Sequence, residues 1–231
     1  MDLPHRALPY PAAVKVTAQE LLKMVSQGEN SHVELKHELP DDDAIARALC
    51  AFANTRGGWL IVGYDPEGEA HGCRNAKGDM SRVRLVAEED LKPALHLNLD
   101  SVRTEHGILL AIQVNTSDDR PHTIPGEKKS RREIIVRVGT TNQVADGATL
   151  NALRSHRTQG QPRDALEQKI LEWLAHYESL TEHPPGDATP AMFGKAANVG
   201  LRRASKAFIN MEREGLLIGC GGRTHRMYAL P

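Results

Sequence analysis

Three carboxylates have the residue types and spacing that could support chemistry on a phosphodiester. Glu29 and Glu34 stand five residues apart where a strand is expected to begin, and Asp65 follows Glu34 by 31 positions. Carboxylate oxygens are the ligands that Mg²⁺ and Mn²⁺ prefer, and such ions can activate water beside a phosphate. Acidic residues near strand ends are also ordinary surface charge. The spacing alone therefore leaves a metal site and a solvated surface both open.

Local patterns place these carboxylates in a mixed α+β domain. Thr17 and Glu20 form a capping box before a helix that ends at Gly28. The segment SHVELKHE alternates as a strand does, and DDDAIARALCAFANT has helical spacing after its first aspartates. Further segments predict a helix (SRVRLVAEEDLKPAL) and strands (WLIVGY, ILLAIQV and EIIVRV), of which WLIVGY is expected to be buried on both faces. We expect an extended lead-in over 1–16 and this domain over 17–153.

The segment FANTRGG joins the second helix to a strand. Asn54 tolerates a left-handed conformation at a helix end, and Gly57 and Gly58 permit a tight turn. We interpret this motif as a structural corner that need not touch a ligand.

The last part of the chain has a different pattern. A polar stretch over 154–163 is the expected linker, and 164–231 is expected to form a small winged helix-turn-helix domain. Its expected helices lie in RDALEQKILEWLAHYESL, TPAMFGKAANV and LRRASKAFINMEREGLL, with a tight turn at Gly200 before the last. Two short strands around a Gly-Gly turn would form the wing.

Basic residues are concentrated in two places although the formal net charge is only -1. From Arg120 to Arg137 there are six basic and two acidic residues, a local excess of four. Such a segment is typical of a phosphate contact or of a solvated hairpin tip. A winged helix would offer further cations to DNA, or would serve protein contacts instead. The predicted nucleic-acid contacts are Lys128, Lys129, Arg131, Arg132, Arg137, Arg202, Arg203, Lys206, Arg223 and Arg226.

Other classes of protein lack support in the sequence. There is no apolar run long enough for a membrane span and no GxxxxGK[ST] loop for nucleotide phosphates. The three cysteines, Cys50, Cys73 and Cys220, are far apart and show no zinc spacing. We therefore expect a reduced, cytoplasmic protein with no membrane partner and no certain cofactor.

Several separated motifs resemble the Schlafen-type, AlbA-like domain, also called divergent AAA. They are GENSHVELK, AFANTRGGWLIVGYDPEGEAHGC, Pro121 and IVRVGTTNQVA, in the family's order from about residue 18 to 146. In Schlafen-type ribonucleases a Glu-x4-Glu pair and a later aspartate form the active site. The resemblance thus implies that Glu29, Glu34 and Asp65 could be catalytic and metal-binding, with Lys36 in support. Proteins of this family that bind DNA as regulators carry the same residues.

Two functions follow from these observations. The first is a DNA-binding transcriptional regulator that uses the winged helix and the basic segment on duplex DNA. The alternative is a Mg²⁺- or Mn²⁺-dependent endoribonuclease acting on tRNA or another structured RNA. Because Schlafen-type nucleases place two lobes in one chain and this sequence has the motif set once, we also expect a homodimer.

Overall fold

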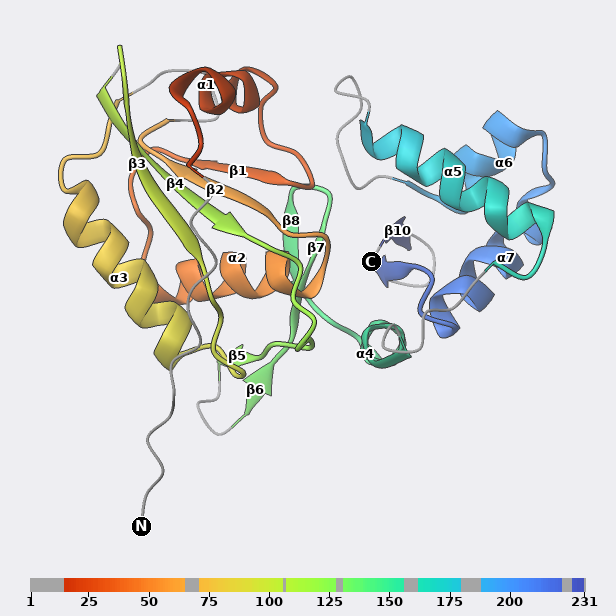
Figure 1. The fold of residues 1–231 in the computed structure, drawn as a ribbon. Helices are drawn as coiled ribbons and strands as arrows, with labels where there is room; N and C mark the ends of the chain where they lie inside the picture. The colour runs from red at the N-terminus through yellow and green to blue at the C-terminus, as the bar shows by residue number, and fades with distance from the viewer. Residues whose placement is uncertain are drawn as a thin grey trace.

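The computed structural model describes most of the chain, and Figure 1 shows its helices and strands. The described residues are 15–64, 71–105, 107–127, 131–155, 162–179, 188–221 and 226–230. The residues with predicted functions that lie outside these ranges are Asp65, Lys128, Lys129 and Arg223.

The centre of the first unit is a mixed sheet with the strand order β1-β2-β4-β3. β1 and β2 run parallel, with Val33 opposite Trp59, and the other neighbours are antiparallel. The bounds are β1 (Val33–Lys36), β2 (Gly58–Val62), β3 (Asn98–Thr104) and β4 (Gly107–Val114). The sequence predicted β1, β2 and β4, but β3 was missed because its sequence, NLDSVRT, is largely polar.

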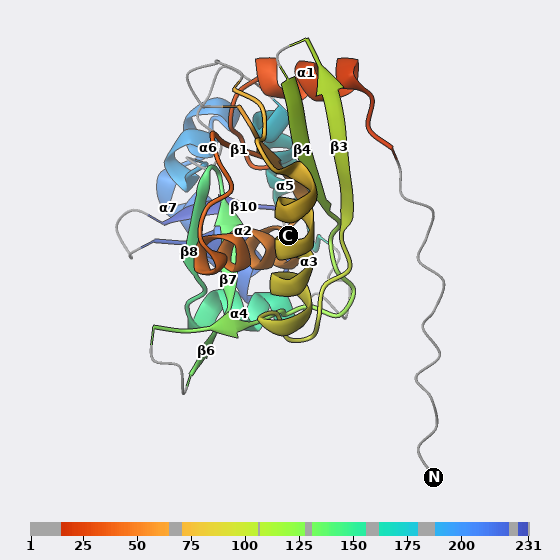
Figure 2. The same cartoon turned by 90° about the vertical axis from the view of Figure 1, so that its left-hand side faces the viewer.

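Helices cover the two faces of this sheet. Along β4, Leu109 and Ala111 belong to the cluster with α1, whereas Leu110 and Ile112 belong to the cluster with α2 and α3. This alternation explains why apolar residues run continuously through the strand, as expected for burial on both faces. The helices are α1 (Ala18–Ser26), α2 (Asp42–Asn54) and α3 (Ala76–Glu89). Figure 2 shows α1 lying apart from α2 and α3.

The ends of these helices follow their capping residues. The predicted capping box of Thr17 and Glu20 is confirmed at α1. α3 begins and ends earlier than predicted. Its first turn is capped by Asn75, whose side chain accepts a hydrogen bond from the Gly78 amide, and it ends before Pro93.

A buried asparagine connects α2 to the strands that come later in the chain. Asn54 is completely buried, and its amide donates to the Ile135 and His122 carbonyls at 2.9 Å each. Its carbonyl accepts from the His122 backbone at 2.7 Å. Asn54 is therefore helical, not left-handed as the sequence suggested, and the motif is a structural corner. The strands beyond α2 are β5 (Ile124–Pro125), β6 (Arg132–Glu133), β7 (Ile135–Val138) and β8 (Thr141–Val144).

The C-terminal unit consists of helices followed by a hairpin. Thr189 caps α6, Pro190 is its first residue, and the turn to α7 passes through Asn198, with φ 52°, and Gly200. Phe193, Phe208 and Tyr228 pack in the core of this unit. The elements are α4 (Gly147–Ser155), α5 (Ala165–Ser179), α6 (Pro190–Ala197), α7 (Leu201–Arg213), β9 (Ile218–Cys220) and β10 (Met227–Ala229). No helix within the described ranges is long and apolar enough to cross a membrane.

The two units pack against each other through an apolar cluster. Val136 and Val138 of β7 contact Leu153 of α4 and Ile218 of β9. Thr149 of α4 also donates a hydrogen bond to the Gly219 carbonyl. Figure 1 shows the C-terminal helices on the side where β7 and β8 lie. α4 was not predicted, and it extends to Ser155, into the stretch expected to be a linker.

Candidate functional site

Two of the predicted carboxylates meet at Lys36. The Lys36 ammonium lies 3.1 Å from Glu34 Oε1 and 3.9 Å from Glu29 Oε1. Glu29 Oε1 also accepts a hydrogen bond of 2.9 Å from the Leu35 amide, which fixes the chain where it enters β1. Lys36 thus contacts both acids, whereas Asp65 lies outside the described residues.

The other oxygen of Glu34 is bound by residues from the β7–β8 hairpin. Arg137 of β7 donates to Glu34 Oε2 at 2.8 Å, and Asn142 of β8 donates to the same oxygen at 3.1 Å. The Arg137 guanidinium also donates to the Asn30 and Val33 carbonyls. Its charge lies 4.7 Å from the centre of the Phe52 ring. Arg137 therefore holds β1 against β7 and α2.

Glu34 is ionised in this environment. Burial alone would raise the pKa of its carboxyl group, but the charges of Arg137 and then Lys36, with the Asn142 hydrogen bond, lower the pKa below its ordinary value. A depressed pKa means that the folded protein holds the charged form more strongly than the unfolded chain does. This contribution to stability is present above the unfolded pKa and is lost as the pH falls.

The contacts of Glu34 leave little room for a metal ion. Its Oε1 faces Lys36 and its Oε2 accepts from both Arg137 and Asn142, so the acceptor positions face cationic or amide donors. Among the described residues no group of three or more His, Cys, Asp or Glu could hold a metal. As placed here, both oxygens of Glu34 already accept from donors, and Asp65, the third predicted ligand, lies outside the described residues.

The basic segment from Arg120 to Arg137 is divided between surface and core. Arg131 is exposed. Arg132 is exposed as well, but its guanidinium donates to the Thr123 side chain and carbonyl at 2.7 Å each, and also to the Asp90 carbonyl. Arg137 is only 2% exposed, so the structure places it in the core and not on the surface where a nucleic-acid contact was predicted. The sequence could not show this, because its partner Glu34 is 103 residues away.

The predicted basic residues of α7 lie on the surface. Ala204, Phe208 and Met211 face the core of the C-terminal unit and are fully buried. Arg202, Arg203 and Lys206 are exposed, and none of them forms a salt bridge with another residue in the described ranges. These three residues form what we call the α7 basic face.

Arg226, which was predicted to contact nucleic acid, is held by acidic residues in the structure. Its guanidinium donates to both Asp146 oxygens, at 2.7 and 3.2 Å, and to both oxygens of Glu212, one of them at 3.0 Å. The hydrogen bonds that Arg226 donates to Glu212 and Asp146 raise its pKa. Its guanidinium joins the start of α4, α7 and the hairpin, where it is engaged by two carboxylates.

The fold and the pairing of Glu34 with Arg137 define a mixed α+β domain that carries the ELK and RVG motifs in contact. The family described as Schlafen, AlbA_2 matches residues 29–146, slightly more than half of the chain. The chain belongs to this family. No curated protein matches it.

Two solved structures are similar to parts of the chain. One is the N-terminal domain of a RecG-related protein from Nitrosomonas europaea, 21% identical, with a TM-score of 0.42; the match covers 56% of this chain and 93% of that one. The other is the DIP2311 protein from Corynebacterium diphtheriae, 21% identical, with a TM-score of 0.41. That match covers 65% of this chain and 34% of that one, so the chain spans about a third of that protein.

Proposed function

We propose that the chain is a DNA-binding regulator whose residues 164–231 form a winged helix-turn-helix. The observation that carries the proposal is the α7 basic face, which has no acidic partner among the described residues. α6 and α7 are joined by a tight turn, and the cations stand in the first turns of the second helix. In helix-turn-helix proteins those positions meet base edges and phosphates in the major groove.

The helix dipole adds a second argument. Cations at a helix N-terminus are opposed by the positive end of the dipole, at a cost of about 0.3–1 kcal/mol each at exposed positions. α7 nevertheless has Arg202 and Arg203 in its first turn, no acidic residue there, and no side-chain cap at Gly200. A phosphate at this end would accept hydrogen bonds from the free amides and would neutralise the cations. The arrangement favours an anionic partner such as duplex DNA.

Replacing Arg202 and Arg203 together by alanine is expected to weaken duplex binding by about tenfold to a hundredfold, since each base contact contributes roughly 1–3 kcal/mol and each phosphate contact less. Fluorescence anisotropy with a pool of random duplexes and then with a selected site would measure the change.

The matched control removes the same charge elsewhere, at Lys169 of α5 and Arg84 of α3, which are both exposed. Equal affinity of the wild type and the α7 variant would contradict the proposal. Point variants in the whole chain are preferable to truncation. Removing residues 164–231 would take away Ile218, against which Val136, Val138 and Leu153 pack.

The alternative activity, a Mg²⁺- or Mn²⁺-dependent endoribonuclease, has weaker support. Lys36 and Arg137 contact the two oxygens of Glu34, where a metal would have to bind. The homodimer expected from the sequence remains part of the DNA-binding proposal. Two copies would present two α7 helices to a palindromic site.

Glu29→Gln provides a clean test of the nuclease, because a glutamine oxygen can keep the hydrogen bond from the Leu35 amide while the charge is lost. We expect that neither the wild-type protein nor this variant, each in large excess, cleaves tRNA in the presence of Mn²⁺. Cleavage by the wild type that Glu29→Gln reduces more than a hundredfold would instead establish the nuclease.

A further inference from the structure

A pocket of about 400 Å³ is lined by residues that belong neither to the Glu34 cluster nor to α7. It lies beyond the carboxyl ends of the parallel strands β1 and β2, between the segment His37–Leu39 and the segment that leads into α3. Ligands of open α/β sheets commonly bind at this edge. The volume is within the range of small-molecule sites.

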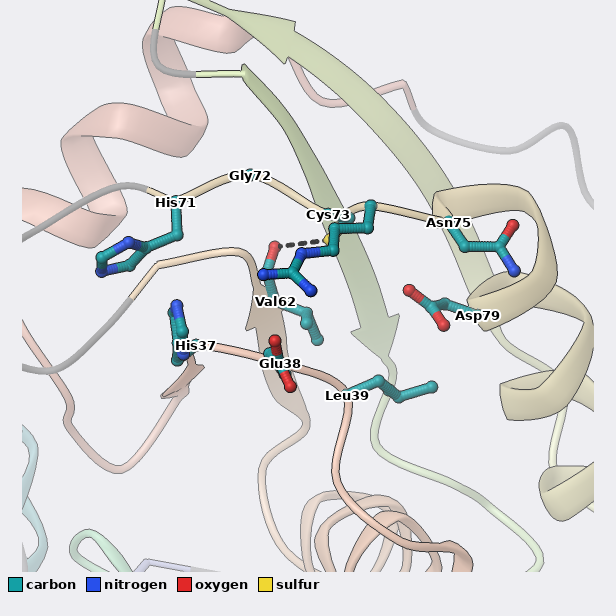
Figure 3. Close-up of a pocket in the computed structure, with 10 residues that line it drawn as sticks. His37, Glu38, Leu39, Val62, His71, Gly72, Cys73, Asn75 and Asp79 are labelled. Carbon is teal, nitrogen blue, oxygen red and sulfur yellow. Dashed lines mark hydrogen bonds between the residues drawn. The ribbon is translucent and has the colours of Figure 1, made fainter.

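Two carboxylates provide the polar part of the pocket. Figure 3 shows Glu38 and Asp79 on different sides of the pocket, with the Asp79 carboxylate turned toward its interior. Within the described part of the chain, neither side chain takes part in a hydrogen bond or salt bridge. Both therefore offer acceptors to a ligand with N–H donors.

The other walls suit a flat ligand. The imidazole rings of His37 and His71 are in edge-to-face contact, with centroids 4.1 Å apart and planes at 78°. Leu39 and Val62 add aliphatic surface. A planar heterocycle could stack on an imidazole and still direct its edge toward a carboxylate.

A metal ion is a poorer fit to this pocket. Although histidines, a cysteine and carboxylates line it, no three of the described His, Cys, Asp or Glu residues come together as a ligand set. The Cys73 thiol donates to the Val62 carbonyl, and burial raises its pKa, which disfavours the thiolate that binds metals.

We propose that this pocket binds a nucleobase with adjacent N–H donors, namely guanine. Guanine carries neighbouring N1–H and N2–H groups on one edge, and a single carboxylate such as that of Asp79 can accept both. Arg74, which also lines the pocket and is exposed, could contact an attached phosphate. The source is a free guanine nucleotide or an unpaired guanine in a strand. This site is separate from α7, and its test does not depend on duplex binding.

Calorimetric titration of the full chain with GMP and with IMP tests the base edge directly, because IMP lacks only the 2-amino donor. We expect GMP to bind at least about tenfold more tightly than IMP, since a hydrogen bond to a charged group contributes about 1.5–3 kcal/mol. A parallel titration uses a single-stranded oligonucleotide with one guanine and its inosine counterpart. Preference for guanine in the strand alone would identify nucleic acid as the source, and preference in GMP would identify the nucleotide.

Asp79→Asn is expected to abolish the preference for guanine over hypoxanthine. Glu88→Gln, which removes an exposed charge from the same helix, should retain it. Absence of binding by both GMP and the guanine oligonucleotide at millimolar concentration would overturn the proposal. So would equal affinity for guanine and hypoxanthine, or a preference that Asp79→Asn leaves intact.

Discussion

Replacing Arg137 by alanine is expected to lower the free energy of unfolding by about 3–5 kcal/mol, the usual cost of leaving one member of a buried ion pair alone. The side chain of Arg137 is 1% exposed and that of Glu34 is 10% exposed, so solvent screens the pair little. The variant would leave Glu34 with Lys36 and Asn142 but without its closest cation. It would also remove the donors that hold the Asn30 and Val33 carbonyls.

Urea unfolding followed by circular dichroism would measure this loss. Arg131→Ala is the matched control, because it removes an exposed arginine from the same segment and should change stability by less than about 0.5 kcal/mol. The double variant Glu34→Leu and Arg137→Met should recover part of the loss, since no uncompensated charge is buried. A single-variant loss no larger than that of the control would disprove that Arg137 holds β1 against β7 and α2.

Arg226→Ala is expected to have a comparable effect, about 3 kcal/mol or more, because it leaves Glu212 buried without its cation. Glu212 has a side chain that is 3% exposed, and Arg226 is its salt-bridge partner among the described residues. The bond to Asp146 is more exposed and should contribute less than about 1 kcal/mol. Because Asp146 begins the connection to α4, the variant should also loosen the packing of the C-terminal unit on β7.

Amide hydrogen exchange would locate this loosening at α4, β9 and β10, with the interior of α2 as the internal reference. Arg213→Ala, an exposed arginine near the end of α7, is the control and should leave exchange unchanged. Exchange in Arg226→Ala that is indistinguishable from the wild type would contradict the role given to Arg226.

The same cluster predicts a dependence on acid. Burial would raise the pKa of Asp146, but hydrogen bonds from Arg226 and Thr149 lower it to about 2. The folded-state pKa is thus below the unfolded value near 4, so the contribution of Asp146 is fully present above pH 4 and disappears as the pH falls to about 2. In Arg226→Ala, the free energy of unfolding should therefore fall less between pH 4 and about pH 2 than it does in the wild type.

Local sequence patterns predicted much of the fold because they report local physics. The capping box at Thr17, the Thr189-Pro190 start of α6 and the continuous apolar strand β4 follow from neighbouring residues alone. β3 and α4 were missed for the opposite reason. The sequence of β3 is mainly polar, and both elements are stabilised by pairing or packing with distant segments.

The candidate site could be predicted only in part. Proximity of Glu29, Glu34 and Lys36 follows from their positions on one short segment. The partners that determine what Glu34 can do come from β7 and β8, and nothing in the local pattern connects them. The joint presence of the ELK and RVG motifs in the family resemblance was the available signal. Arg226 was likewise predicted to be a surface cation, because its acidic partners are 80 and 14 residues away.

The most direct test of the proposed function is to incubate the wild-type chain with labelled duplex DNA and labelled tRNA together, with and without Mn²⁺. Binding and cleavage are then read from the same samples at 50 and 200 mM salt, conditions chosen because phosphate contacts weaken steeply over that range. We predict a salt-sensitive shift of the duplex, a weaker shift of tRNA, and both nucleic acids intact with Mn²⁺. Cleavage of tRNA that requires Mn²⁺, or a duplex that remains unbound at 50 mM salt, would contradict a DNA-binding regulator.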